Sequence, residues 1–317
     1  MQRVLLTDHI ADAAVHVFDD YPGIEARRIG TPTHAELLEI IADYDAIIVR
    51  SPTRVPADVI ERGRRLKFIG RAGVGVDNID VYAAARRNVV VMNSPGANTI
   101  STAEHTIAVI LAVARRLPQA HASVVAGAWE RSEFRGVELC GKTLGVIGLG
   151  RVGREVARRM AAFEMRVLAA DPFVSREAAG AAHAQLVPLE DLIAESDWIT
   201  VHVPLAADTV GLIGAAEIAR MKDGVVIVNC ARGDVVDENA LADALDAGKV
   251  AAVGLDVFVE EPPGRHRLFS HPRSVFTPHI AAATAEAQLR VATDIARAVA
   301  DALSGRGVRD AIGPPTP

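Results

Sequence analysis

The sequence of 317 residues has very little cysteine, with Cys140 and Cys230 as its only two. Two cysteines cannot build a disulfide framework, and no paired Cys and His spacing of the kind that holds structural zinc occurs. We therefore expect a reducing compartment and no metal site.

A surplus of basic residues is also missing. The chain has 34 Lys and Arg against 40 Asp and Glu, a formal net charge of -6 and a pI near 5.9. Because binding to nucleic-acid phosphates needs clustered Lys and Arg, we expect no nucleic-acid partner.

Long apolar runs are absent as well. No stretch is long enough to span a bilayer, and the N-terminus lacks the apolar core of a signal peptide. We expect a cytoplasmic protein with no membrane partner. Half of the residues are hydrophobic and 23% are charged, an ordinary globular composition with enough mass for two domains.

What the sequence does contain is two series of short β-branched runs that alternate with helix-like segments. This rhythm predicts βα units around parallel sheets, and the second series is apolar on both faces, as buried parallel strands are. The expected strands are 4–7, 24–29, 46–49, 67–71 and 89–92, then 143–147, 166–170, 198–203, 225–229, 252–257 and 274–277.

Between the two series lies an Ala- and Leu-rich stretch that predicts a linker helix. It follows the turn at residues 93–96, and Thr99 or Ser101 can cap it, with Glu104 near its first turn. From about Ala285 the sequence turns helical again, and we expect the Pro-rich tail at 313–317 not to pack as a helix.

A glycine pattern, GLGRVG at 148–153, follows the expected strand 143–147 and opens a helix, which is the context that gives it meaning. Gly148 would make the tight turn, Gly150 would let a pyrophosphate approach the backbone, and Gly153 would let helix and strand pack closely. The pattern predicts a dinucleotide cofactor.

The next expected strand ends in Asp171, at the separation where a carboxylate reaches the adenosine ribose hydroxyls and repels a 2'-phosphate. This favours NAD over NADP. The alternative for Asp171 is a turn-forming residue before Pro172.

Three polar residues follow the ends of strands in the second series, namely Arg232, Glu261 and His279. Ligands bind at this edge of an open α/β sheet, and reduction of a 2-oxo acid needs these residue types. Arg232 would hold a carboxylate, His279 would exchange a proton with the C2 oxygen, and Glu261 would orient the imidazole. Taken singly, each of these residue types at a strand end is more often an ordinary surface or hydrogen-bonded residue, so the prediction depends on their joint placement.

In these motifs the chain resembles the D-isomer-specific 2-hydroxyacid dehydrogenase family, and the resemblance extends over nearly its whole length. The resemblance is carried by the glycine pattern and by residues 49–51, 70–80, 93–99, 127–131, 229–233, 256–262, 277–280 and 285–288. It implies Arg232, Glu261 and His279 as the catalytic set. Further implied contacts are to NAD from Arg151, Val152, Asp171, Cys230 and Asp256, and to substrate from Arg50, Ser51, Arg71 and Gly73.

The resemblance also implies the fold and the assembly. We expect an α/β protein with two doubly wound parallel-sheet domains, in which a Rossmann NAD-binding domain (95–285, with the linker helix) is inserted into a flavodoxin-like substrate domain (1–94 and 286–317). It further implies a homodimer built around the linker-helix region.

Within the family, the phosphoglycerate branch is the closer match. Arg50 and Arg71 each follow an apolar strand, and together with Arg232 they suit a substrate with both a phosphate and a carboxylate. We therefore predict NAD-dependent oxidation of 3-phosphoglycerate to 3-phosphohydroxypyruvate, in serine biosynthesis. The alternatives are a glyoxylate or hydroxypyruvate reductase and a non-enzymatic, corepressor-like NAD sensor; both arginines could also be plain solvated residues.

Some positions depart from the phosphoglycerate pattern. Ala281 and Ala283 stand where Gly and Ser are frequent, Pro52 follows Arg50-Ser51, and Glu164 occupies a usual Gly. The sequence given stops at Pro317, which leads us to expect a short form without a serine-binding regulatory domain.

Overall fold

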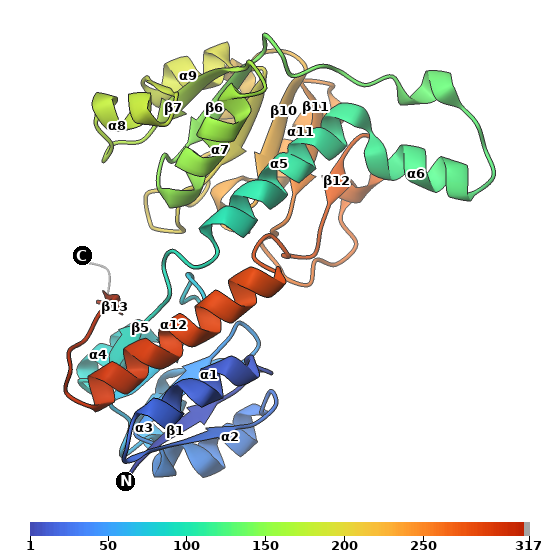
Figure 1. Cartoon of the computed structure of the whole chain (residues 1–317). Coiled ribbons are helices and arrows are strands. Elements are labelled where there is room, and N and C mark those ends of the chain that lie inside the picture. The colour runs from blue at the N-terminus through green and yellow to red at the C-terminus, as the bar shows by residue number, and fades with distance from the viewer. Residues whose placement is uncertain (314–317) are drawn as a thin grey trace. The chain divides into compact units, whose positions relative to one another are not determined.

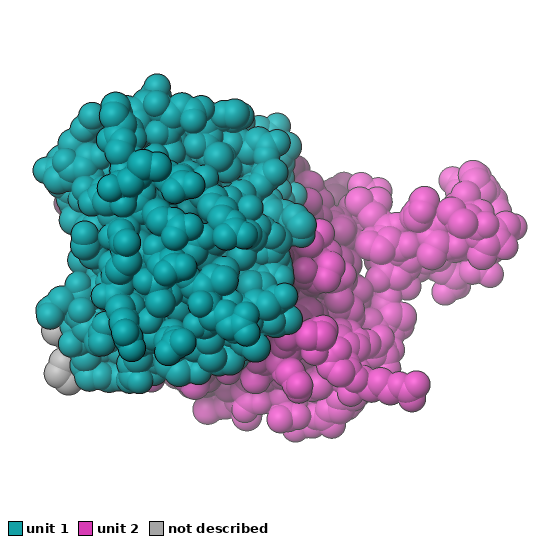
Figure 2. Space-filling view, turned by 90° about the horizontal axis from the view of Figure 1, so that it is seen from below, with its two compact units in different colours: residues 1–98, 283–317 teal, residues 99–282 magenta. Residues whose placement is uncertain are grey.

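The computed structural model describes residues 1–313, and the chain forms two units with a sheet each. Unit 1 consists of Met1–Asn98 together with the segment that begins at Ala283, and unit 2 is Thr99–Ala282 (Figure 2). Helices cover both faces of each sheet (Figure 1). The predicted α/β class with two doubly wound parallel sheets is confirmed.

Unit 1 is built on a six-stranded sheet with the order β13-β5-β4-β3-β1-β2. All neighbours are parallel except β13, which pairs antiparallel with β5. The strands are β1 (Gln2–Leu6), β2 (Ile24–Arg28), β3 (Ala46–Val49), β4 (Phe68–Arg71), β5 (Val90–Met92) and β13 (Ala311–Ile312). Its helices are α1 (Asp12–His16), α2 (His34–Ile40), α3 (Ala57–Arg62), α4 (Val81–Arg86) and α12 (Ala285–Leu303).

The long helix α12 completes the core of unit 1. Thr284 caps it by accepting a hydrogen bond from the N–H of Ala287 at 3.1 Å. Its apolar face packs on the sheet above Gly70 of β4, where an added Cβ would lie 2.8 Å from Ile295. The segment from Ala285 onward, far away in sequence, is therefore part of the same core as the N-terminal strands.

Unit 2 is built on a seven-stranded sheet with the order β12-β11-β10-β9-β6-β7-β8, parallel throughout. The chain order reverses between β6 and β9, and ligands bind at such a switch point. The strands are β6 (Thr143–Ile147), β7 (Arg166–Ala170), β8 (Gln185–Leu186), β9 (Trp198–Val201), β10 (Val225–Asn229), β11 (Val250–Leu255) and β12 (Val275–Phe276).

Neighbouring residues of a strand in unit 2 belong to two different apolar clusters. On β10, Val226 and Val228 pack in the cluster that includes helices α5 (Thr99–Arg115) and α7 (Arg151–Ala161), whereas Val225 and Ile227 pack in the opposite one. Both faces of the sheet are therefore buried, which explains the continuous apolar runs. The helices of this unit are α5 (Thr99–Arg115), α6 (Leu117–Val125), α7 (Arg151–Ala161), α8 (Arg176–Ala181), α9 (Leu189–Glu195), α10 (Ala215–Arg220) and α11 (Glu238–Asp246).

The sequence missed two strands. β8 and β13 have two residues each, too few for an apolar run to mark them. The strand expected at 274–277 is also shorter, since only Val275–Phe276 pair with β11. Residues 314–317 of the predicted tail lie outside the described residues.

Within residues 1–313 no helix combines the length and the apolar character needed to span a bilayer.

Candidate active site

The glycine loop lies at the switch point, between the end of β6 and the first turn of α7. Gly148 has φ +90°, and a Cβ there would lie 2.8 Å from the main chain of His202. A Cβ on Gly153 would lie 2.1 Å from the carbonyl oxygen of Gly148, so helix and strand can approach only without a side chain. By contrast, no atom lies within 4 Å of a Cβ built on Gly150. The three positions thus have the three properties that a pyrophosphate loop needs.

Helix α7 presents its N-terminus at this loop. Gly150 is the N-cap, and no side chain caps the helix. Arg151 and Val152 form its first turn, next to Gly153. Because the first N–H groups of a helix carry partial positive charge and lack intrahelical partners, this end suits an anionic group.

Asp171, directly after β7, is tied to the glycine loop. Its Oδ2 accepts a hydrogen bond from the N–H of Leu149 at 2.8 Å, and its Oδ1 accepts one from the N–H of Phe173 at 2.9 Å. The carboxylate therefore makes the local turn before Pro172 and also reaches the glycine loop. A carboxylate at this position after the second strand is typical of a site that prefers NAD to NADP.

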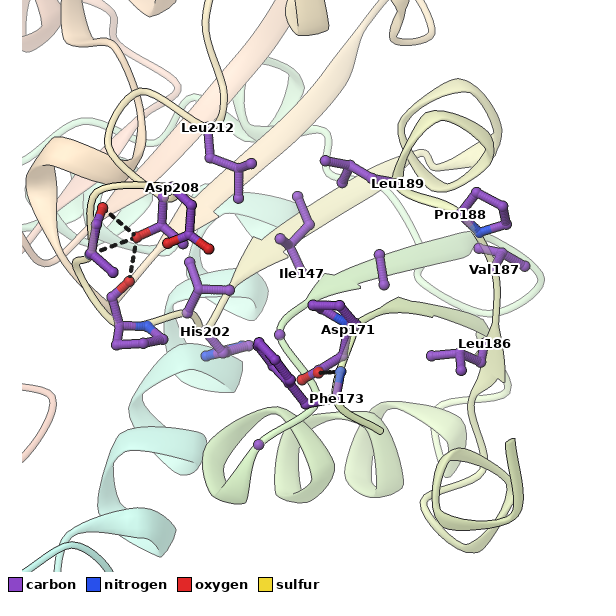
Figure 3. A pocket seen from close by; sticks show the side chains of 18 of the residues that line it. Ile147, Asp171, Phe173, Leu186, Val187, Pro188, Leu189, His202, Asp208 and Leu212 are labelled. Atoms are coloured by element: carbon purple, nitrogen blue, oxygen red, sulfur yellow. Dashed lines mark hydrogen bonds between the residues drawn. The ribbon is translucent and has the colours of Figure 1, made fainter. Parts of the chain in front are cut away.

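A cavity of about 850 Å³ opens beside these residues, and all of its walls belong to unit 2. Gly148, Gly150 and Asp171 line one side (Figure 3). Most of the other lining side chains are apolar and come from β8, the start of α9, the loop between them and the segment after β9, with Arg176, Asp208 and Thr209 among the polar ones. Leu186, Val187, Leu189 and Leu212 are among the apolar ones. A predominantly apolar cavity beside an anion-binding loop and a carboxylate fits a dinucleotide with its adenine in the apolar part.

Two residues that follow strands at the carboxyl edge of this sheet, His202 after β9 and Cys230 after β10, have strongly shifted pKa values. Burial lowers the pKa of His202, which lines the cavity, to about 4, so its ring is neutral at pH 7. Burial, with the nearby Asp256 carboxylate, raises the pKa of the Cys230 thiol to about 12. Cys230 therefore stays a thiol and has no nucleophilic character.

His279 and Glu261 form a hydrogen-bonded pair beyond the ends of β12 and β11. Nδ1 of His279 lies 2.7 Å from Oε2 of Glu261, and Oε1 of Glu261 accepts from the N–H of Phe258 at 3.2 Å. The side chains are 46% and 37% exposed, which leaves room for a ligand at the ring. An imidazole that donates from Nδ1 to a carboxylate has Nε2 left to exchange a proton.

Asp256, fully buried after β11, holds the backbone around His279. The N–H of His279 donates to its main-chain oxygen at 2.8 Å, and the next two N–H groups, of Ile280 and Ala281, donate to its carboxylate at 2.9 and 2.8 Å. His279 itself has φ +52°, a conformation that costs a non-glycine residue free energy and needs such support.

The Asp256 carboxylate has two further partners. It accepts a hydrogen bond from Thr277 at 2.5 Å and lies 3.3 Å from Nε2 of His105 on α5. Burial alone would raise the pKa of Asp256, but these partners outweigh it and hold that pKa below its usual value. The carboxylate is therefore ionised.

Asn229, the last residue of β10, forms hydrogen bonds with the backbone on which Arg232 stands. Its Oδ1 accepts from the N–H of Ala231 at 2.9 Å, and its Nδ2 donates to the carbonyl of Arg232 at 2.8 Å. Gly233 then passes so close to the next loop that a Cβ on it would lie 2.1 Å from the carbonyl carbon of Phe258. The Arg232 loop therefore packs directly on the loop in which the N–H of Phe258 donates to Glu261.

The expected substrate residues lie in unit 1, at the end of β4 and in the loops after β3 and β4. Nη2 of Arg71 donates to Oγ of Ser51 at 2.7 Å, and Nη1 donates to the carbonyl of Ala72 at 2.7 Å. The guanidinium covers Gly73, where a Cβ would lie 1.5 Å from Nη1, and Gly73 has φ +148°. Arg50 and Ser51 begin the neighbouring loop, so the four residues form one group at the ligand edge of the sheet.

Residues 107–281 match the family of the D-isomer specific 2-hydroxyacid dehydrogenase, NAD binding domain. This chain belongs to that family. The predicted family is thus confirmed, and with it the NAD-binding domain that the glycine loop, Asp171 and the cavity fit.

Three relatives illustrate the similarity. The D-3-phosphoglycerate dehydrogenase of Archaeoglobus fulgidus is 52% identical over 99% of this chain, and that of Synechocystis sp. is 43% identical over 99%. This chain spans 60% and 56% of the length of those two proteins. The crystal structure of a glyoxylate reductase from Paecilomyes thermophila superposes with a TM-score of 0.90 at 32% identity, covering 98% of each chain.

Sequence reasoning missed the residues that hold the site together. Asn229 and His105 received no site role, and Asp256 was expected only as a cofactor contact. Their functions depend on which N–H groups reach them after folding. The signal available was only that each is polar within an apolar stretch.

Proposed function

We propose that the protein oxidises 3-phosphoglycerate to 3-phosphohydroxypyruvate with NAD, in serine biosynthesis. The reaction class rests on one observation, the 2.7 Å contact between His279 and Glu261 in a unit that belongs to the dehydrogenase family. The choice of substrate is supported by the 52% identical relative of that name and by the two arginines of unit 1.

His279 acts as the base in this direction. The C2 hydroxyl gives its proton to Nε2, and the C2–H bond breaks with its electron pair, so that C2 becomes a ketone. Glu261 holds the imidazole by Nδ1 and stabilises the imidazolium that forms. In the reverse direction the same proton returns to the C2 oxygen.

NAD, held by the glycine loop, the N-terminus of α7 and Asp171, would supply the hydride acceptor. Arg232 binds the substrate carboxylate, since its planar fork can donate two parallel hydrogen bonds. Arg50 and Arg71 bind the phosphate. Ser51, which accepts a hydrogen bond from Arg71, keeps that guanidinium extended across Gly73.

Initial rates with a panel of substrates test the proposal. We expect NAD-dependent oxidation of 3-phosphoglycerate with a kcat/KM at least about a hundredfold above those of glycerate and D-lactate, since a phosphate held by two arginines adds several charge-assisted hydrogen bonds. Arg50→Ala should raise the KM for 3-phosphoglycerate but not for glycerate. The control is Arg64→Ala, which changes an exposed arginine in the segment before β4, whereas Arg50 follows the end of β3. Equal turnover of glycerate would refute the substrate.

Glyoxylate or hydroxypyruvate reduction is the second candidate, because a glyoxylate reductase has the same fold at 32% identity. This reaction would use Arg232, Glu261 and His279 and would not need Arg50. With NADH, a preference for glyoxylate or hydroxypyruvate over phosphohydroxypyruvate would favour it. Binding of NAD without any turnover would instead favour the non-enzymatic sensor.

A homodimer formed through α6 is part of the proposal. Helix α6 has no buried residue and lies apart from the sheet of its unit (Figure 1). Leu117, Val124, Val125 and Trp129 in and after this helix are 53%, 55%, 73% and 78% exposed. An apolar patch of this kind typically marks an interface. Light scattering should give twice the chain mass, and Val125→Asp with Trp129→Arg should shift it toward the monomer, whereas Val210→Asp, an exposed control, should not.

A cytoplasmic location is also proposed. Cys140 is exposed and both cysteines are free thiols, which suits a reducing compartment. Cell fractionation with an antibody against the native chain tests it.

A further inference from the structure

A buried carboxylate, that of Asp8, forms hydrogen bonds with the loop that contains Arg50 and Ser51. Asp8, two residues after β1, is 4% exposed, and its Oδ2 accepts a hydrogen bond from the N–H of Arg50 at 2.7 Å. Its Oδ1 accepts from Oγ1 of Thr53, also at 2.7 Å, and Thr7 donates to Oδ2 at 3.0 Å. Three neutral donors thus surround one charge.

Asn78 holds the same loop by its carbonyl groups. Its Nδ2 donates to the carbonyl of Arg50 at 2.8 Å and to that of Thr53 at 2.6 Å. Asp8 and Asn78 therefore take hold of both the N–H and the C=O of Arg50, and of both the hydroxyl and the C=O of Thr53. Three backbone groups and one side-chain hydroxyl on either side of Ser51 are therefore fixed.

We propose that Asp8 and Asn78 are positioning residues for phosphate recognition: they fix the 50–53 loop so that Arg50, and Ser51 with its partner Arg71, meet the substrate in one arrangement. This inference rests on the proposed function, because it takes Arg50 and Arg71 as the phosphate-binding residues. Neither Asp8 nor Asn78 would touch the substrate.

The burial and the backbone conformation of Asp8 both cost folding free energy, more than a residue with only a packing role would require. A carboxylate has been removed from water without a cation among these contacts, which is unfavourable by itself. Its backbone has φ +64°, and His9 follows with φ +51°, a conformation that non-glycine residues rarely adopt. Strain of this kind concentrates at functional sites.

The sign of the effect separates positioning from simple electrostatics. Asp8 is negative and lies beneath an arginine that would bind a dianion, so its charge alone weakens phosphate binding. Removal of that charge by Asp8→Asn would then lower the KM for 3-phosphoglycerate. If Asp8 positions the loop, the same variant raises this KM, because the amide offers one acceptor where the loop needs two oxygens and places an N–H against another donor.

Steady-state kinetics of the full chain provide the test. For Asp8→Asn we expect the KM for 3-phosphoglycerate to rise about tenfold, in line with the cost of misplacing a binding group, with kcat changed less than about threefold. The KM for glycerate and the dissociation constant of NAD should stay at their wild-type values. A purely structural role would instead lower the melting temperature and kcat with both substrates and leave each KM unchanged, which would overturn the proposal.

A milder pair of variants decides the matter if Asp8→Asn does not fold. Thr53 is 2% exposed, and Thr53→Val has nearly the same shape but lacks the donor to Asp8. Thr53→Ser retains that donor. We expect Thr53→Val to raise the KM for 3-phosphoglycerate severalfold and Thr53→Ser to leave it near wild type; equal values for the two variants would overturn the proposal.

Arg50→Ala distinguishes failure of this inference from failure of the proposed function. If Arg50→Ala leaves the KM for 3-phosphoglycerate unchanged, the phosphate role of Arg50 is wrong and the inference falls with it. If Arg50→Ala raises this KM but Asp8→Asn and Thr53→Val do not, only the positioning role is wrong. In the double variant, Asp8→Asn should add little to Arg50→Ala, because both act through one side chain.

Discussion

The N–H of His279 donates to the main-chain oxygen of Asp256 at 2.8 Å, and the Asp256 carboxylate receives the next two N–H groups of the same loop. The left-handed backbone of His279 is thereby held by one buried residue. The direction of the imidazole depends on that backbone, so in the proposed mechanism Asp256 would act on proton transfer through His279.

We expect Asp256→Asn to lower kcat by tenfold or more, since a shift of about 1 Å in a reacting group is costly. The variant should also unfold more easily, by about 1 to 3 kcal/mol, because the buried amide cannot satisfy all the donors that face it. Rates and chemical denaturation measure both effects. The control is Asp45→Asn, which changes another buried aspartate, directly before β3 of unit 1. It should lower the free energy of unfolding and leave kcat unchanged.

Glu261→Gln should lower kcat/KM on the order of a hundredfold, the typical contribution of assisted proton transfer. The amide can keep a hydrogen bond to His279 but cannot stabilise the imidazolium. Glu260→Gln changes the adjacent, exposed glutamate and should behave as wild type. Similar kinetics for the two variants would show that the contact with His279 has no part in catalysis.

Asp171→Ser should reduce the preference for NAD over NADP by at least tenfold, expressed as the ratio of the two kcat/KM values. The reason is that a carboxylate fixed by Leu149 and Phe173 repels the additional phosphate of NADP, and serine does not. Glu190→Gln on α9 removes an exposed charge near the cavity as a control. An unchanged ratio would mean that other residues select the cofactor.

His202 should make the protein less stable in mild acid. Its pKa is about 4 in the folded state and near 6.5 in the unfolded state, so between these pH values the unfolded chain binds more protons. Stability therefore falls as the pH drops from 6.5 toward 4, by up to about 3 kcal/mol at 1.4 kcal/mol per pKa unit. For His202→Gln, denaturation curves should give a smaller loss of the free energy of unfolding over this pH interval. His183→Gln, at an exposed position outside the cavity, should lose as much as wild type.

The fold could be predicted from the sequence where periodicity and glycine chemistry are strong. Strands 143–147, 166–170 and 225–229 have the expected bounds, because their apolar runs are buried on both faces. The glycine loop could be predicted because its pattern directly follows a buried strand and opens a helix. Only Gly153 is required by a contact within a few residues, with Gly148, whereas the contact that requires Gly148 is with the distant His202.

The supporting residues of the site could not be predicted in this way. Asp256 acts on a loop about 25 residues later, and Asp8 holds one that begins at Arg50. Such pairs meet only at the edge of a folded sheet. A lone aspartate after a strand looks the same in sequence whether it forms a turn or fixes a distant loop.

Unit 2 is one uninterrupted stretch, Thr99–Ala282, and it contains the cofactor cavity together with Arg232, Glu261 and His279. The arginines proposed to read the phosphate lie wholly outside that stretch. Recombination at two points in the gene, near the codons for residues 98 and 283, would therefore transfer all of unit 2 into another protein of this type. The substrate acid could then change during evolution while the residues proposed for hydride and proton transfer were inherited unchanged.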